Sequence, residues 1–293
     1  MPEGLDLRRL EVPVIQAGMG GVSRHELAAA RKITGRPIAV NLLLPFLRAG
    51  DAAQAAGADA IVTFWGEPRR LAKTTWIHQC GSVPEAKAAA AAGADAVIAQ
   101  GLEAGGYVRG TVPLLELLER VRAAVEIPIL AAGAIIDVDD VRAALDAGAS
   151  AAVLGTRFLL STESHAHPEY KRRCLEAGET VLTELFGLGW PDAPHRVIPN
   201  RATRRWLRAD SRGPRWILVA NRLTAPLARR TPSALQDRAS TSRRASPPFL
   251  GPRPPTDDGP TSLVDWGPLY AGAGVARISD ICPAADLVKA LTP

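Results

Sequence analysis

The chain has 293 residues, of which 47% are hydrophobic, and a formal net charge of +5 at pH 7. It contains no run of 18 or more uninterrupted apolar residues and does not begin with a basic region followed by an apolar stretch. We therefore expect neither a transmembrane helix nor a signal peptide. The three cysteines are far apart in the sequence, which fits a reducing cytoplasm and no metal site.

The first half of the chain alternates short apolar runs with alanine-rich segments of helical spacing. Continuous apolar runs of this kind are typical of parallel strands that are covered by helices on both faces. Three of the helical segments end in the related phrases AAGADAIV, AAGADAVI and DAGASAAV, in which glycine ends a helix before a strand begins. We expect seven strands, at 12–18, 37–44, 60–65, 75–80, 96–101, 128–133 and 151–156.

Repeated strand–helix units of this size are found in (β/α) barrels and in doubly wound sheets. Polar or glycine residues lie at the C-terminal ends of nearly every expected strand, where a TIM barrel places its sites, whereas a doubly wound sheet would gather them at one switch point. The residues concerned are Gln16, Asn41, Gln79, Gln100, Gly133 and Thr156. The pattern therefore predicts an α/β TIM barrel that lacks one strand–helix unit, because seven strand candidates occur rather than eight.

The pattern changes after residue 161, and we divide the chain there. Residues 1–161 are expected to form the barrel core, and 162–230 a helical extension with helices at 167–186 and within 202–230. Residues 231–262 are rich in proline and arginine and predict an extended connector, and 263–293 should pack back on the barrel. The arginines between 196 and 253 accompany no nucleic-acid motif, so a solvated face is expected, with neither nucleic acid nor a membrane as partner.

Two groups of residues have the chemistry of a ligand site. Gly133, Gly155 and Thr156 follow the last two strands, where backbone N–H groups of a barrel can bind phosphate; ordinary helix capping is the alternative. Met19 lies in a glycine-rich turn that would admit a planar ring. Asn41 and Gln100 could offer donors and acceptors to that ring, or be satisfied buried amides.

The stretch AQGLEAGGYVRG (99–110) places Gly105 and Gly106 directly before Tyr107. Two residues without a Cβ allow a ligand or another segment to approach the backbone closely. Tyr107 would then point at what is bound there. Glu103 could order this turn or orient a ligand.

Six segments in succession resemble the nitronate monooxygenase (2-nitropropane dioxygenase) family: PVIQAGMGGVS, AVNLLLP, IHQCGS, AVIAQGLEAGGYVRG, PILAAGAI and AAVLGTRFL. The family consists of FMN-dependent TIM-barrel enzymes, and the likeness covers most of residues 12–192. It implies oxidation of alkyl nitronates by dioxygen to a carbonyl compound and nitrite. It further implies flavin near Met19, FMN contacts at Asn41, Gln100, Gly105 and Gly133, and phosphate contacts at Val153, Leu154, Gly155 and Thr156.

The chain departs from the family at Tyr107, where the family usually has a histidine that acts as a base. Tyrosine has an ordinary pKa of about 10 and is a poor base at pH 7, but its hydroxyl can donate a hydrogen bond to a nitronate oxygen. His78 is a possible substitute base, or a histidine bonded against the surrounding helices. The other four histidines carry no motif signal.

Three interpretations follow. The first is an FMN enzyme of the nitronate monooxygenase type, with a small-molecule nitronate and dioxygen as its substrates. The second is a flavin-dependent enoyl reductase or related NAD(P)H oxidoreductase. The third is a non-catalytic barrel that binds FMN or another phosphate ligand.

Overall fold

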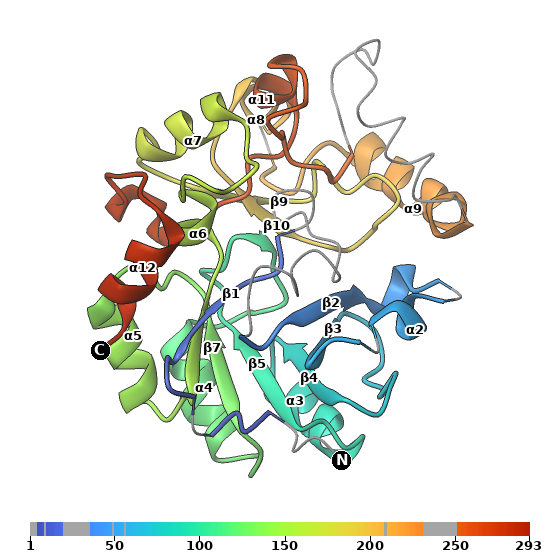
Figure 1. The fold of residues 1–293 in the computed structure, drawn as a ribbon. Coiled ribbons are helices and arrows are strands. Elements are labelled where there is room, and N and C mark those ends of the chain that lie inside the picture. Colours follow the sequence, from blue (N-terminus) through green and yellow to red (C-terminus); the bar gives the residue numbers. More distant parts are fainter. Residues whose placement is uncertain are drawn as a thin grey trace.

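The computed structural model describes residues 5–8, 10–19, 36–48, 50–55, 57–207, 210–230 and 251–293. Its centre is a sheet of seven parallel strands in the order β1-β8-β7-β5-β4-β3-β2 (Figure 1). The strands are β1 (Val14–Gln16), β2 (Ala39–Leu43), β3 (Ala60–Phe64), β4 (Thr75–Cys80), β5 (Ala96–Gln100), β7 (Ile129–Ala132) and β8 (Ala151–Leu154). Each of the seven predicted strands is confirmed.

The sheet curls into an incomplete barrel whose edge strands, within the described residues, are β1 and β2. Neither edge strand pairs with the other, as expected for a barrel that lacks one strand–helix unit. The two edges nevertheless approach each other at their carboxyl ends. A Cβ added to Gly18, just after β1, would lie 2.8 Å from Nδ2 of Asn41 in β2. The helical segment expected between them lies outside the described residues.

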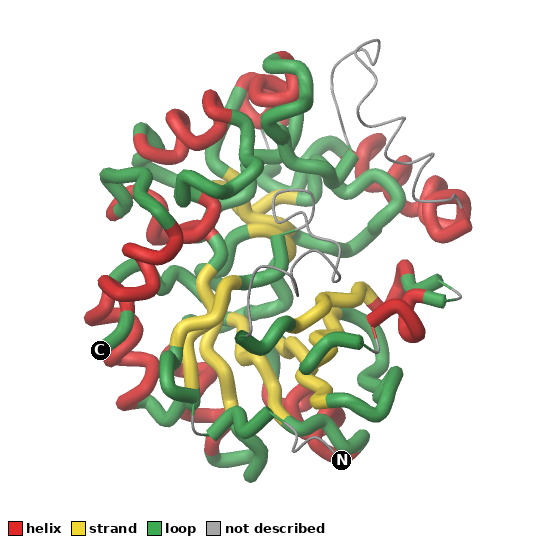
Figure 2. The backbone as a smooth tube through the Cα atoms, viewed as in Figure 1, coloured by secondary structure: helices red, strands yellow, loops and turns green. Residues whose placement is uncertain are grey.

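Helices cover the outer face of the sheet (Figure 2). Helix α3 begins where the Ser82 hydroxyl accepts a hydrogen bond from the Glu85 N–H, and α5 begins with a reciprocal capping box between Asp137 and Asp140. A glycine in a left-handed conformation follows both helices, as the repeated sequence phrase predicts. The covering helices are α2 (Asp51–Ala55), α3 (Val83–Ala91), α4 (Leu114–Arg122), α5 (Val138–Asp146) and α12 (Ala284–Leu291).

Alternating side chains of the strands belong to two separate apolar clusters. The interior of the barrel is filled by small and branched residues such as Ile77, Ile98 and Val153. Trp76 and Leu154 instead belong to the larger cluster between the sheet and its helices. The side of the sheet on which a strand residue lies therefore decides whether it can reach a ligand inside the barrel.

A second, three-stranded antiparallel sheet contains β6 (Gly106–Tyr107), β10 (His195–Val197) and β9 (Val181–Thr183) in that order. The prediction of one helix over 167–186 is therefore wrong in its second half, because α7 (Pro168–Leu175) ends before Gly178 and the chain then enters β9. The apolar spacing of VLTELF suits a helix, but its backbone pairs with β10 instead. Two helices follow, α8 (Arg201–Trp206) and α9 (Arg215–Arg230).

The last described segment runs through α11 (Ser262–Trp266) and the short helix η2 (Ala273–Arg277) to α12. It packs on the loops that follow the barrel strands: Ala273 N donates to the Glu103 carbonyl at 2.9 Å, and Arg157 forms an ion pair with Asp280 at 2.8 Å. Of the predicted connector 231–262, residues 231–250 lie outside the described residues. None of the described helices combines the length and the apolar character that crossing a membrane requires.

Candidate active site at the carboxyl ends of the strands

The loops after β7 and β8 contain the predicted phosphate cradle. Among the described residues, a Cβ added to Gly155 would meet only the Ala17 Cβ, at 3.7 Å, so the described structure leaves the space over this glycine open. The Thr156 hydroxyl accepts a hydrogen bond from the Gly272 N–H at 2.9 Å, which leaves its own proton free to donate. Thr156 also begins the short helix α6 (Thr156–Leu159), whose first N–H groups have no partner within the helix. These are donors suited to an anion.

The other residues predicted for the cradle lie beside it. Gly133 directly follows β7, and the next residue, Ala134, has a left-handed backbone with φ +50°. Val153 and Leu154 end β8 with their side chains buried, Val153 inside the barrel and Leu154 under the helices, so Leu154 can offer a ligand only its backbone. The guanidinium of Arg157, which follows Thr156, is bonded to Asp280. The donors that the cradle offers are therefore neutral backbone N–H and hydroxyl groups.

Asn41 and Met19 lie near the open edge of the sheet. The Asn41 side chain is exposed and packs against Gly18, so its amide is accessible to a ligand at the mouth of the barrel. Met19 is half-buried and contacts both the cluster under the helices and a cluster formed with the C-terminal segment. The sulfur side chain is thus held close to the loops that follow β7 and β8.

Gln100 is buried at the end of β5 and spans the turn that contains the two glycines. Its Nε2 donates to the Tyr107 carbonyl at 2.8 Å, and its Oε1 accepts from the Arg109 N–H at 2.8 Å. Both ends of the amide are thereby occupied in holding the turn. Glu103 accepts a hydrogen bond from the Leu114 N–H at the start of α4, which favours its structural role in ordering the turn.

Each of the two adjacent glycines has its own surroundings. A Cβ on Gly105 would lie 2.5 Å from Gly272 N, so the approach that this glycine permits is that of the C-terminal segment. Gly106 has φ +71° and open space where a Cβ would project. The open side of the turn is therefore at Gly106, immediately before Tyr107.

Tyr107 lies in an aromatic cluster that forms only in three dimensions. Its ring stacks on Trp190, with ring centroids 3.9 Å apart and an interplanar angle of 29°, and meets Trp65 edge-on. Its hydroxyl oxygen is buried beside the Tyr270 hydroxyl, which donates to the Pro252 carbonyl at 2.8 Å, and it makes no hydrogen bond of good geometry with the described residues. Burial raises the pKa of the Tyr107 phenol well above its ordinary value, and the neighbouring Tyr270 side chain opposes only part of that shift. The group is therefore a hydrogen-bond donor and not a base near pH 7.

His78 lies on the outer face of β4, together with Trp76. Its Nδ1 shares a hydrogen bond of 2.8 Å with Thr63 Oγ1, which also accepts from the Trp76 indole N–H. Burial, and secondarily the positive charge of Arg109, lowers the pKa of His78 to about 4. The structure thus separates His78 from the interior of the barrel, in agreement with the structural alternative given above.

His195 is the histidine nearest to Tyr107 in the described structure. The two residues face each other across β10 and β6, with ring centroids 5.3 Å apart. The His195 Nε2 accepts from the Phe186 N–H, so Nδ1 carries the proton and donates to the Ala193 carbonyl. Burial lowers the pKa of His195 to about 4, and with both nitrogens occupied this ring supports the cluster without acting as a base.

Four residues of this cluster were not predicted as part of the site: Trp65, Trp190, His195 and Tyr270. Trp65 follows β3 with a left-handed backbone, φ +62°, which no local sequence signal announces. Trp190, His195 and Tyr270 reach Tyr107 from segments that are distant in the sequence. In the sequence, only their aromatic character could have indicated that they belong to this cluster.

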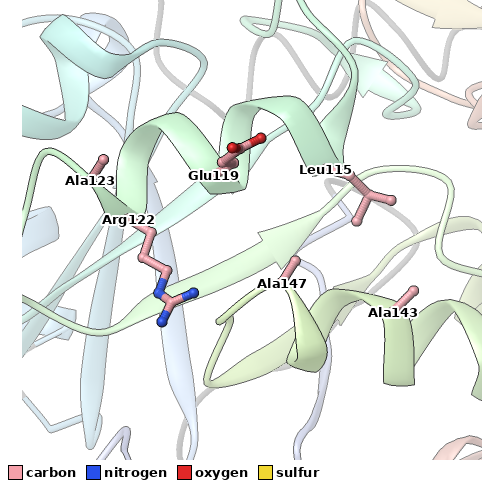
Figure 3. Close-up of a pocket in the computed structure, with 6 residues that line it drawn as sticks. All are labelled: Leu115, Glu119, Arg122, Ala123, Ala143 and Ala147. Atoms are coloured by element: carbon pink, nitrogen blue, oxygen red, sulfur yellow. The ribbon is translucent and has the colours of Figure 1, made fainter.

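One surface hollow lies away from these loops, between α4 and α5 on the outer side of the barrel (Figure 3). Arg122 and Glu119 supply its charged groups, and the rest of its lining is formed by alanines and Leu115. It contains no aromatic, histidine or glycine-loop feature and lies on the helices instead of at the strand ends. The candidate active site is therefore the region around Gly155, Asn41 and Tyr107.

Comparison with known proteins shows to which family the chain belongs. The nitronate monooxygenase domain family matches residues 67–293. A (3aS,4S,5R,7aS)-5-hydroxy-7a-methyl-1-oxo-octahydro-1H-indene-4-carboxyl-CoA dehydrogenase from Mycobacterium tuberculosis is 32% identical over 71% of this chain and 68% of its own length. A nitronate monooxygenase from Pseudomonas aeruginosa is 43% identical, but over 42% of this chain and only 37% of its own length.

Solved structures match over nearly the whole chain. A nitroalkane oxidase from Streptomyces ansochromogenes has a TM-score of 0.70 at 28% identity and is matched over 96% of this chain and 94% of its own. FabK from Thermotoga maritima has a TM-score of 0.73 at 23% identity, covers 98% of this chain and 93% of its own, and supports the fold alone. The chain is an oxidoreductase with a TIM-barrel-like fold and belongs to the nitronate monooxygenase family.

Proposed function

We propose that the chain binds FMN at the carboxyl ends of its barrel strands. Gly133, Gly155 and Thr156, with the backbone of Val153 and Leu154, would hold the phosphate. The open space over Gly155 and the free proton of the Thr156 hydroxyl support this assignment, because a phosphate needs both room and donors. Asn41 and Met19 would contact the ring system. Gln100 and Gly105 would contribute by shaping the turn beside it.

The reaction that we propose is the oxidation of a preformed alkyl nitronate to a carbonyl compound and nitrite. When bound, FMN supplies the redox chemistry that takes electrons from the nitronate and transfers them to dioxygen. The chain supplies a site for an anion: the Tyr107 hydroxyl donates a hydrogen bond to a nitronate oxygen, and the stack on Trp190 fixes its direction. The observation that carries this proposal is that the Tyr107 hydroxyl is buried beside Tyr270 but makes no hydrogen bond of good geometry with the described residues.

The same surroundings argue against neutral nitroalkanes as substrates, because these must first lose a proton from carbon. Tyr107 has a raised pKa, His78 lies outside the barrel interior, and both nitrogens of His195 are occupied. A well-placed general base contributes about 10²–10⁴-fold to such a step. We therefore expect nitroalkane turnover to be lower than nitronate turnover by a factor in this range.

A second candidate is a flavin-dependent NAD(P)H oxidoreductase or dehydrogenase that acts on an acyl thioester. It is favoured by the similarity to the mycobacterial dehydrogenase, which extends over 71% of this chain. A non-catalytic FMN-binding barrel is the third possibility.

One experiment separates the three. The purified protein is examined for flavin absorbance, its flavin is extracted and identified, and it is then mixed anaerobically with a preformed nitronate or with NADPH. Bleaching by the nitronate supports the proposal, and bleaching by NADPH alone supports the second candidate. FMN that neither reagent bleaches supports the third, and FAD in place of FMN contradicts the cofactor assignment.

A further inference from the structure

Helix α9 exposes a continuous apolar stripe. Seven large hydrophobic side chains are exposed in the described part of the chain, and four of them lie on this one helix. They are Trp216 (50% exposed), Val219 (54%), Leu223 (76%) and Leu227 (69%). Their spacing of three and four residues places them within about 80° of arc on one face, over a length of about 16 Å. Exposed apolar residues that gather in this way, unlike scattered ones, mark interaction sites.

The opposite face of α9 holds the helix on the protein, and within the stripe Trp216 meets Trp206 of α8 edge-on, with ring centroids 5.5 Å apart. Ile217 is fully buried, and Asn221 Nδ2 donates to the Glu184 carbonyl at 3.0 Å. The Thr224 hydroxyl accepts from the Gly189 N–H at 3.0 Å, which also anchors the loop that leads to Trp190. Helix α9 lies at the right-hand edge of the molecule in Figure 1, and the exposure of the stripe shows that it faces away from the core.

The charges of α9 indicate what kind of partner the stripe accepts. The helix contains four arginines and no acidic residue. Arg215 and Arg222 lie seven positions apart and flank the stripe on one side, where Arg222 also forms an exposed ion pair with Asp192 at 2.9 Å. Helix α8 adds further arginines but no acidic residue. Segment 231–250, which follows α9 directly, has three arginines against one aspartate.

A second copy of this helix would bring arginines against arginines with no acidic residue of either helix between them, which is unfavourable. The segment after α9 is also basic and offers no better complement. The complementary surface is apolar and negatively charged. A helix with Trp and Leu on one face and arginines beside it is typical of helices that lie in the interface of an anionic lipid bilayer.

We propose that the exposed face of α9 docks on the surface of an anionic phospholipid bilayer. The stripe enters the boundary between headgroups and acyl chains, and the flanking arginines contact lipid phosphates. The contact is peripheral. It differs from the expectation in the sequence analysis that a membrane is not a partner, because the sequence showed the basic excess but not the exposed apolar face beside it.

The test measures sedimentation of the full chain with vesicles. One preparation contains phosphatidylcholine alone and the other a mixture of phosphatidylcholine and phosphatidylglycerol. We expect binding to the mixed vesicles that weakens with added salt, together with a blue shift of tryptophan fluorescence, and little binding to phosphatidylcholine. The double substitution Leu223→Gln/Leu227→Gln should abolish binding. Arg215→Gln/Arg222→Gln should weaken it about tenfold to thirtyfold.

Matched controls change exposed residues of the same two types elsewhere. Leu115→Gln replaces a leucine on α4 that is 52% exposed, and Arg142→Gln replaces an exposed arginine on α5; both should bind like the parent protein. Circular dichroism verifies that each variant is folded. Equal binding to both vesicle types, no binding to the mixed vesicles at low salt, or an equal loss in the Leu115 control would overturn the proposal. So would a dimer in solution that Leu223→Gln/Leu227→Gln dissociates while vesicles are not bound.

Discussion

Replacing Tyr107 by phenylalanine should raise the stability of the protein while lowering its activity. Phenylalanine retains the ring that stacks on Trp190 at 3.9 Å and removes only the buried hydroxyl, which makes no hydrogen bond of good geometry with the described residues. An unsatisfied buried polar group costs about 1–3 kcal/mol, so the free energy of unfolding should rise by up to that amount. The melting temperature should rise by on the order of 2–4 °C for each kcal/mol gained.

The effect on catalysis should have the opposite sign. A hydrogen bond to a charged group contributes about 1.5–3 kcal/mol, so losing the one to a nitronate should lower kcat/KM by about 10- to 150-fold. The assays are denaturant unfolding of the flavin-free protein and nitrite release from a preformed nitronate. The matched control is Tyr170→Phe, which removes a hydroxyl that donates to the Tyr270 carbonyl and should destabilise by about 1 kcal/mol. If Tyr107→Phe destabilises the protein as the control does, or leaves nitronate turnover unchanged, the assigned role of the hydroxyl is wrong.

Three further predictions concern the cradle, the missing base and pH. Gly155→Val should lower flavin retention, measured by the ratio of flavin to protein absorbance, because the new side chain would fill the space over Gly155. The control Gly178→Val, where a Cβ also meets open space, should retain flavin, and equal retention in the two variants would exclude the cradle. Tyr107→His should raise nitroalkane turnover by a factor near the low end of the ~10²–10⁴-fold range, because burial in the cluster that holds His195 should lower the pKa of the new histidine. An unchanged nitroalkane rate in a variant that still oxidises nitronates would contradict this. The free energy of unfolding should fall as the pH drops from about 6.5 toward 4, because His78 and His195 have pKa values of about 4 in the folded protein and the unfolded chain therefore binds more protons than the folded one in that range. Denaturant unfolding at pH 7 and pH 5 checks this, and equal free energies of unfolding at the two pH values would contradict it.

The barrel could be predicted from sequence because its signals are local. Continuous apolar runs identified each strand of the parallel sheet, and the glycine after each repeated helix marked where a strand would follow. The strand β9 could not be found in this way, because the choice between helix and strand for VLTELF depends on pairing with β10 across a loop of a dozen residues. Short edge strands of this kind are determined by tertiary contacts.

The candidate site was predictable only in part, for a similar physical reason. The residues next to strand ends, such as Gly133 and Gly155, were recognisable because a barrel gathers strand ends at one rim. The surroundings of Tyr107 were not, because Trp190 and Tyr270 reach it from segments far along the chain. The role of His78 could be assigned only by knowing which face of β4 is covered by helices. The alternation of His78 with Trp76 places the two on one face but does not say which face that is.

The central claim is that the site oxidises an anion that has already lost its proton. The most direct test measures initial rates of nitrite release by the flavin-loaded protein. A preformed nitronate and its parent nitroalkane are each mixed fresh and followed before the two forms interconvert. We predict rapid release from the nitronate and release from the nitroalkane that is slower by about 10²–10⁴-fold. Equal initial rates from the two forms would contradict the claim, because a base would then have to be present in the site.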